Sequence, residues 1–192
     1  MRVLRASSYR SMPWKNGGGT TTEIAVHPEG AGLDTFEWRV SMARVETDGP
    51  FSGFPGVDRT LAILEGSGIV LNIKDRKPVT LKRTSKPLSF PADVQTSAEL
   101  VSGPITDLNV MTGRGAWKHS VERVASGATK TLTLDSEATL VLVADGEASL
   151  RIPGDEGGLA ARDCAIFDRS PDALVLTPHG ACTLFIVRLD RV

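Results

Sequence analysis

The chain has 192 residues, of which 41% are hydrophobic and 23% charged, so it is long enough for one core or for two small halves. Its 22 basic and 23 acidic residues nearly cancel, which excludes the overall basic field that holds nucleic acid. No apolar run approaches the ~20 residues of a membrane span, and the first residues lack the apolar stretch of a signal peptide. We therefore expect a cytoplasmic protein whose two cysteines, Cys164 and Cys182, are small core residues.

The segment 13–24, PWKNGGGTTTEI, places three glycines directly before residues that favour a strand. A phosphate-binding loop needs Lys and Ser or Thr after its glycines and then a helix, whereas here the lysine precedes them. The glycines therefore indicate either a strained turn at the rim of a barrel or a loop over a binding site. In the second interpretation the ligand-binding residues are Lys15, Asn16, Gly17, Gly18 and Thr20.

Strand patterns follow one another along the rest of the chain. Residues 36–43 alternate between apolar and polar side chains, the period of a half-buried strand. Two apolar runs, 61–64 and 69–73, flank the sequence EGSG and predict a hairpin. Further strands are expected at 24–26, 108–111, 132–134 and 184–189. No stretch keeps a helical period over about twelve residues, so the sequence predicts an all-β chain.

An internal repeat indicates two similar halves. LAILEGSGIVLNI (61–73) resembles LVLVADGEASLRI (140–152) when Gly66 is placed on Gly146, and each copy later reaches a hydrophobic segment, 88–90 or 165–167. We therefore expect two packed β-barrels or jelly rolls, an N-terminal half at 1–116 and a C-terminal half at 117–192. The LEGSG turn with its later proline resembles the cupin pattern, which makes the chain a bicupin.

A metal site is not expected. Many cupins hold a metal through convergent histidines and a carboxylate, but His27, His119 and His179 are isolated in this sequence. The stretch before the first predicted turn, 54–59, contains no histidine where the usual pair would lie. We expect neither a metal nor another cofactor.

Four segments together carry a resemblance to a known family. MPWKNGGGTTTEI, FEWRVSMARV, GPFSGFPGVDRTLAILEGSG and DLNVMTGRG occur in this order between residues 12 and 115. They resemble the HutD/Ves family, accessory proteins often found with bacterial histidine-utilisation genes. The resemblance implies a metal-free bicupin that senses or buffers a small acid of histidine breakdown, such as urocanate or N-formylglutamate.

A pocket for such an acid needs cationic and neutral donors, and the strand patterns offer candidates. Arg39 and Ser41 share one strand face, opposite Trp38, so they point either into the barrel or toward solvent. Glu23 on the preceding strand is a further candidate, as a partner of Arg39 or as part of the pocket.

Two other strands supply the remaining candidates. A type II turn at Pro55-Gly56 delivers Asp58 and Arg59, which either tether the loop or contact the ligand. Asn109 and Met111 share a face of their strand, and an inward Asn is suited to a carboxylate or formyl group. The alternative is that Asn109 bonds a neighbouring turn.

Hydrolytic catalysis fits the sequence poorly, since it has no G-x-S-x-G motif. A cupin-type isomerase, lyase or amidohydrolase-like enzyme that uses a buried Lys15 remains the alternative to a binding protein. A purely structural module with a filled barrel is the third. The expected partner is a small organic acid, not nucleic acid or a membrane, and a homodimer is left open.

Overall fold

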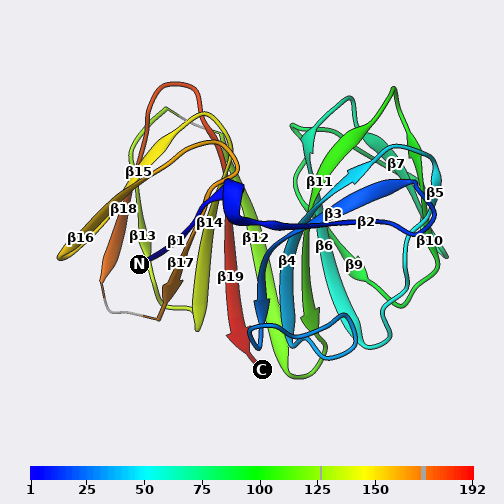
Figure 1. The fold of residues 1–192 in the computed structure, drawn as a ribbon, viewed down its shortest axis with the longest axis horizontal. Helices are drawn as coiled ribbons and strands as arrows, with labels where there is room; N and C mark the ends of the chain where they lie inside the picture. The colour runs from blue at the N-terminus through cyan, green and yellow to red at the C-terminus, as the bar shows by residue number, and fades with distance from the viewer. Residues whose placement is uncertain (126, 170–171) are drawn as a thin grey trace. The chain divides into compact units, whose positions relative to one another are not determined.

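The computed structural model describes residues 1–125, 127–169 and 172–192, and β-strands make up its regular structure (Figure 1). Among these residues the helical structure is limited to one 3-10 turn, η1 at Ala6–Ser8. No helix in the described part of the chain is long and apolar enough to cross a membrane. The prediction of an all-β chain is confirmed.

The chain divides into two compact units. The N-terminal unit is Arg10–Lys118, and the C-terminal unit combines Met1–Tyr9 with His119–Val192. The sequence placed the boundary after residue 116 and assigned residues 1–9 to the first half. In the structure those nine residues belong to the C-terminal unit, because β1 (Arg2–Leu4) pairs with β17 (Cys164–Asp168).

The N-terminal unit is built from two antiparallel sheets around a core. The larger sheet has the order β2-β3-β4-β11-β6-β9 and the smaller one the order β5-β10-β7-β8. The core includes Leu61 and Ile105 from the larger sheet and Leu71 from the smaller one, so it lies between them. Their strands are β2 (Arg10–Pro13), β3 (Gly19–His27), β4 (Trp38–Val45), β5 (Gly49–Pro50), β6 (Val57–Glu65), β7 (Ile69–Ile73), β8 (Val79–Leu81), β9 (Leu88–Pro91), β10 (Thr96–Leu100) and β11 (Ile105–Gly113).

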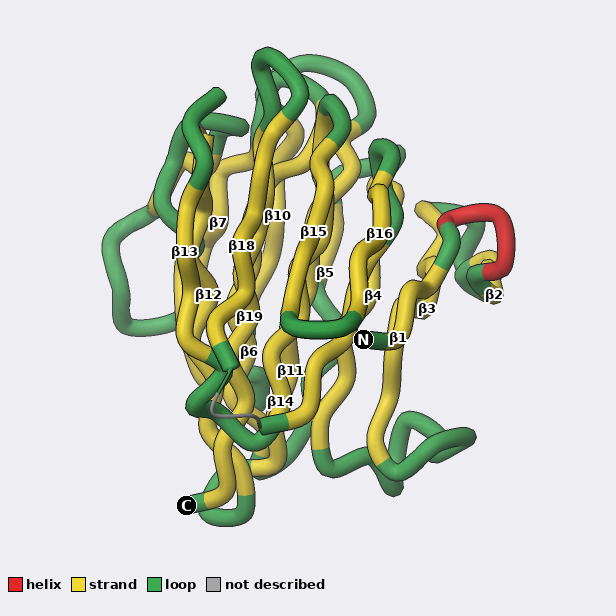
Figure 2. The backbone as a smooth tube through the Cα atoms, turned by 90° about the vertical axis from the view of Figure 1, so that its left-hand side faces the viewer, coloured by secondary structure: helices red, strands yellow, loops and turns green. Residues whose placement is uncertain are grey.

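The C-terminal unit repeats this arrangement. Its sheets have the orders β1-β17-β14-β19-β12 and β13-β18-β15-β16, and the smaller one can be followed strand by strand in Figure 2. Leu150, Phe167 and Leu184 belong to the core between them. The remaining strands are β12 (Trp117–Ala125), β13 (Lys130–Thr133), β14 (Ala138–Asp145), β15 (Ala148–Ile152), β16 (Asp155–Leu159), β18 (Ala173–Pro178) and β19 (Thr183–Arg191). Among the described residues neither pair of sheets closes into the expected barrel.

The internal repeat is present, but its central turn is not a hairpin. β6 lies in the larger sheet and β7 in the smaller one, so the EGSG turn carries the chain from one sheet to the other. β14 and β15 are separated in the same way. The predicted hairpin at 61–73 is therefore wrong, because β6 pairs with β9 and β11 in its own sheet and β7 pairs with β8 and β10 in the other.

Glycines explain why the chain crosses between sheets at these points. Gly66 has a φ of +88°, and a Cβ there would lie 2.6 Å from the carbonyl oxygen of Pro104. Gly146 has a φ of +85°, and its Cβ would lie 2.6 Å from the carbonyl oxygen of Ala181. Both positions combine a left-handed backbone with a close backbone approach, which only glycine tolerates.

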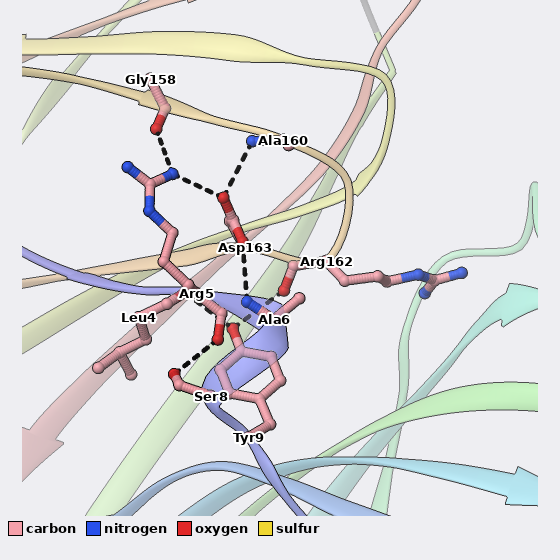
Figure 3. A network of polar contacts seen from close by, with 9 residues as sticks. All are labelled: Leu4, Arg5, Ala6, Ser8, Tyr9, Gly158, Ala160, Arg162 and Asp163. Atoms are coloured by element: carbon pink, nitrogen blue, oxygen red, sulfur yellow. Dashed lines mark hydrogen bonds and ion pairs between the residues drawn. The ribbon is translucent and has the colours of Figure 1, made fainter.

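A polar network fastens the N-terminal segment to its unit (Figure 3). Arg5 donates to an oxygen of Asp163 at 2.7 Å and to the carbonyl of Gly158 at 2.8 Å. The backbone N–H groups of Ala6 and Ala160 also donate to the Asp163 carboxylate. Although burial acts to raise the pKa of Asp163, these hydrogen bonds and the charge of Arg5 lower it on balance.

Replacing Asp163 with Asn should destabilise the C-terminal unit by about 2 kcal/mol, since a buried acceptor of charged and backbone donors is lost. A depressed pKa means that the stabilisation is present above about pH 4, the ordinary range of Asp, and disappears as pH falls through the lower folded-state pKa. Urea unfolding at neutral pH and near pH 3 measures this difference. Asp168→Asn, an exposed change at the far end of β17, is the control and should stay within about 0.5 kcal/mol. An equal effect of Asp163→Asn at both pH values would contradict the charge argument.

Candidate functional site

A cavity of about 680 Å³ lies within the N-terminal unit. Polar side chains of the larger sheet form its floor, and the β2–β3 loop and the segment around β5 supply aromatic residues. Its lining residues are Met12, Pro13, Trp14, Lys15, Asn16, Thr21, Leu33, Arg39, Ser41, Ala43, Val45, Thr47, Asp48, Gly49, Pro50, Phe51, Ser52, Phe54, Arg59, Ala98, Asn109 and Met111.

The floor is set by the register of three neighbouring strands. Met111 on β11 lies opposite Arg39 on β4 and opposite Arg59 on β6. One step along the same face, Asn109 lies opposite Ser41. Because side chains two residues apart share a strand face, this register collects two cations, an amide and a hydroxyl on one surface. Of the two orientations left open for Arg39 and Ser41, the structure has the inward one.

Arg39 is buried, with 4% of its surface exposed. Its Nε donates to an oxygen of Glu23 at 2.8 Å, which fixes the side chain against β3. Its Nη2 is buried and has no hydrogen-bond partner. Arg39 therefore retains an unused donor, although Glu23 already balances its charge.

Arg59 is equally buried but has a different environment. Its guanidinium carbon lies 5.4 Å and 5.3 Å from the ring centres of Phe51 and Phe54. Nη2 approaches the carbonyl oxygen of Ser52 at 3.4 Å, and Nε has no partner. Burial lowers the pKa of Arg59 to about 10, with Arg39 also acting to lower it and Asp107 acting to raise it. The group remains charged at neutral pH, in a setting that leaves room for an anion.

Asp107 lies on the same face of β11, two residues before Asn109, with none of its surface exposed. Its Oδ1 accepts a hydrogen bond from Nδ2 of Asn109, and its Oδ2 has no partner. Burial raises the pKa of Asp107 to about 7, against the lowering effects of Arg59 and of the Ala43 backbone N–H. This carboxyl group changes charge near neutrality.

The glycine triplet spans the end of the β2–β3 loop and the first residue of β3, at the mouth of the cavity. Gly17 has a φ of +71°, and the backbone N–H of Gly18 donates to the side chain of Asn16. Trp14 donates through Nε1 to the Thr21 hydroxyl at 2.8 Å. A Cβ on Gly19 would lie 2.2 Å from the carbonyl oxygen of Arg44, so this glycine approaches the neighbouring strand rather than a phosphate.

The structure brings together seven of the twelve residues that the sequence proposed for ligand binding. The lining contains Lys15, Asn16, Arg39, Ser41, Arg59, Asn109 and Met111. Gly17, Gly18, Thr20, Glu23 and Asp58 are outside it. Glu23 still touches the site through Arg39, but Asp58 is half-exposed and pairs with Arg114 at 2.8 Å. Thr20 lies on the opposite face of β3 from Thr21.

Sequence reasoning missed several contributors. Asp107 could have been found, because it lies two residues before Asn109 and must share its strand face. Phe51 and Phe54 lie outside regular alternation, in a segment where β5 covers only two residues, so no periodic signal marked them.

Metal-ligating side chains are not grouped in the part of the chain that the structure describes: no three His, Cys, Asp or Glu residues come close enough to hold an ion. The expected lack of a metal in the purified protein remains a prediction.

Two of the three equivalent positions in the C-terminal unit carry apolar side chains. Asp107 lies opposite Ile63, three residues before the crossover glycine Gly66. Leu184 lies opposite Val143, three residues before Gly146, so Asp107 and Leu184 occupy equivalent positions. By the same register Ile186 corresponds to Asn109, and Thr139 corresponds to Arg59. Leu184 and Ile186 belong to the core of their unit, so the polar floor is a feature of the N-terminal unit.

Comparisons with known proteins agree in pointing to one family. The family model described as HutD matches residues 6–186. A Pseudomonas putida protein named "Uncharacterized 21.2 kDa protein in hutC 3'region" is 32% identical over 94% of this chain and 93% of its own length. Protein Ves from Citrobacter koseri is 35% identical over 89% of this chain and 87% of its own. The structure of HutD from Pseudomonas fluorescens, solved in a formate condition, is 30% identical with a TM-score of 0.84, covering 100% of this chain and 98% of that one.

More distant structures agree on the fold alone. A cupin 2 conserved barrel domain protein from Leptotrichia buccalis is 10% identical, with a TM-score of 0.61 over 97% of this chain and 100% of that one. The cupin-like fold predicted from the sequence is thereby confirmed.

Proposed function

Because the chain belongs to the HutD family, we propose that it binds a small organic acid of histidine breakdown, of the urocanate or N-formylglutamate type, in the cavity of the N-terminal unit. Binding of this acid modulates histidine utilisation. The neighbourhood of a histidine-utilisation gene in the name of the P. putida relative and the formate condition of the P. fluorescens HutD structure are compatible with this proposal.

The observation that carries the proposal is the pair of buried arginines. Arg39 and Arg59 flank Met111 on one sheet face, line the same cavity, and each retain a buried nitrogen without a partner. Leaving a buried donor of each arginine without a partner costs stability, even though Glu23 balances the charge of Arg39. A carboxylate that accepts from both guanidinium groups offsets this cost, since charge-assisted hydrogen bonds to arginine are the strong ones.

The remainder of the cavity suits a small, partly flat molecule. Its volume of about 680 Å³ is in the range of ordinary small-molecule sites. Trp14, Phe51 and Phe54 supply apolar surface for a ring or a short chain, while Ser41 and Asn109 offer hydrogen-bonding groups on the floor. The combination favours an acid over a neutral compound of the same shape.

A thermal-shift series with urocanate, N-formylglutamate and their carboxamide counterparts tests the proposal. An acid at a hundred times its dissociation constant should stabilise the fold by ~2.7 kcal/mol. This corresponds to a rise in melting temperature of roughly 5 to 11 °C for a chain of this size. The carboxamides, which lack the charge, should produce little shift. A series without any shift would contradict the proposal.

The enzymatic alternative is tested with the same compounds. Lys15 is exposed at the mouth of the cavity, whereas the alternative needs it buried. We therefore expect urocanate and N-formylglutamate to be recovered intact by chromatography after hours with an equimolar amount of protein. Turnover that disappears in Lys15→Ala, and persists in the control Lys86→Ala at an exposed position outside the lining, would establish the enzyme instead.

A further inference from the structure

The floor of the cavity contains one side chain whose orientation is set by a neighbour on the same strand. Asn109 lines the cavity, and its Nδ2 donates to Oδ1 of the fully buried Asp107. Among the described residues, the Asn109 side chain makes this one hydrogen bond. An ionised carboxylate has acceptors only, so it must receive the amide N–H. The carbonyl oxygen of Asn109 is then left for the cavity.

The cavity therefore presents both hydrogen-bond donors and a hydrogen-bond acceptor on one sheet face. Arg39 and Arg59 present donors, and Asn109 presents an acceptor one step along the same strands. A simple carboxylate satisfies the arginines but leaves the carbonyl of Asn109 without a partner. A molecule that also carries an N–H or O–H group satisfies both, and leaving a desolvated acceptor unpaired is the more costly outcome.

We propose that Asp107 is a positioning residue that turns the Asn109 carbonyl toward the ligand, so that the site selects acids with a hydrogen-bond donor beyond their carboxylate. This rests on the proposed function, because it describes the ligand of the same cavity. An imidazole ring or an amide N–H attached to a short acid has the required chemistry.

The charge of Asp107 determines whether the side-chain amide of Asn109 is fixed in one orientation. On the inner face of the larger sheet the charged neighbours are Arg59 on β6, Arg39 on β4 and Glu23 on β3. The facing sheet contributes apolar core residues such as Leu71, and Lys15 and Asp48 line the mouth. A protonated Asp107 can donate to the Asn109 carbonyl, which lets the amide turn its N–H group into the cavity. The preference for a donor should therefore weaken as pH falls below neutrality.

Two matched ligands test the inference by calorimetry. Pyrrolylacrylate has a ring N–H and furylacrylate has a ring oxygen in its place, and neither ring titrates near neutral pH. At about pH 8 the full chain should bind pyrrolylacrylate roughly ten-fold more tightly, the worth of one hydrogen bond. At about pH 6 the ratio should shrink toward one. Equal affinities at the higher pH would overturn the inference while leaving acid binding intact. Failure of both acids to bind would count against the proposed function itself.

Variants separate the positioning role from structure. In Asp107→Asn the buried partner can donate as well as accept, so the ratio of affinities should fall to about one while furylacrylate still binds. Asn109→Leu removes the acceptor and should give the same ratio, which keeps the test open if Asp107→Asn does not fold. Glu99→Gln, an exposed change on β10, should leave the ten-fold ratio unchanged. A ratio that stays ten-fold in Asp107→Asn would overturn the role of Asp107.

Discussion

Arg59→Met is expected to weaken the binding of small carboxylic acids by roughly 100-fold without lowering the stability of the ligand-free protein. The guanidinium is buried between Phe51 and Phe54 with an unpartnered nitrogen, and burial lowers its pKa. A lowered pKa in a cation means that the folded state disfavours the charge, so removing it relieves a cost. Met fills a similar volume and keeps contact with the aromatic rings.

The matched variant Arg39→Met tests this reasoning on the same sheet face. Arg39 is held by Glu23 at 2.8 Å, so its loss leaves a carboxylate without its partner and should lower the melting temperature. Both variants should lose acid binding, but only Arg39→Met should lose stability. Calorimetric titration and thermal unfolding of the two proteins measure the contrast. Normal acid binding by Arg59→Met, or a clear loss of its stability, would show that Arg59 is structural.

The local patterns of the sequence predicted the strands well, but they could not predict which strands pair. The apolar runs in β6 and β7 are correctly placed on either side of a short glycine-containing turn. A hairpin and a crossover between sheets give the same pattern, because each strand has one face toward the same core. The difference lies in contacts distant in sequence, such as the close approach of Gly66 to Pro104.

In the candidate site, too, local patterns predicted some features, whereas others depend on contacts distant in sequence. Arg39, Ser41, Asn109 and Met111 were identified because period two places them on shared faces, and the strand register then brings the faces together. The pairing of Asp58 with Arg114 joins residues 56 positions apart, which no local pattern indicates. The aromatic lining from Phe51 and Phe54 likewise depends on contacts distant in sequence, because their backbone N–H groups donate to the carbonyl oxygens of Thr96 and Ala92.

The two units give the repeat a physical interpretation. They share strand order and crossover glycines, yet the inner face that carries Arg59, Asp107 and Asn109 in one carries Thr139, Leu184 and Ile186 in the other. Leu184 and Ile186 add to the core of their unit, where Thr139 has a buried hydroxyl without a partner. In the N-terminal unit Arg59 and Asn109 instead line a cavity. The cavity with its polar floor is therefore a feature of the N-terminal unit, and we propose that binding occurs there.

Gly19→Ala is expected to destabilise the N-terminal unit by about 3 kcal/mol or more, lowering its melting temperature by roughly 6 to 12 °C. The first Cα pair of β3 and β4 is Gly19 with Val45, and a Cβ at residue 19 would lie 2.2 Å from the carbonyl oxygen of Arg44. That oxygen belongs to the backbone of a paired strand, so it cannot move aside as a flexible side chain can. The same Cβ would lie 3.1 Å from the Trp14 ring and press on the residue that donates to Thr21 at the cavity mouth.

Gly17→Ala, in the loop two residues before Gly19, is the control. A Cβ there meets nothing within 4 Å, but the φ of +71° makes alanine unfavourable by about 1 kcal/mol. Denaturant unfolding should therefore rank Gly19→Ala well below Gly17→Ala, and Gly19→Ala should also weaken acid binding by disturbing Trp14. If the two variants unfold at the same denaturant concentration, the close approach of β3 to β4 at Gly19 is wrong, and the glycine triplet serves only the turn.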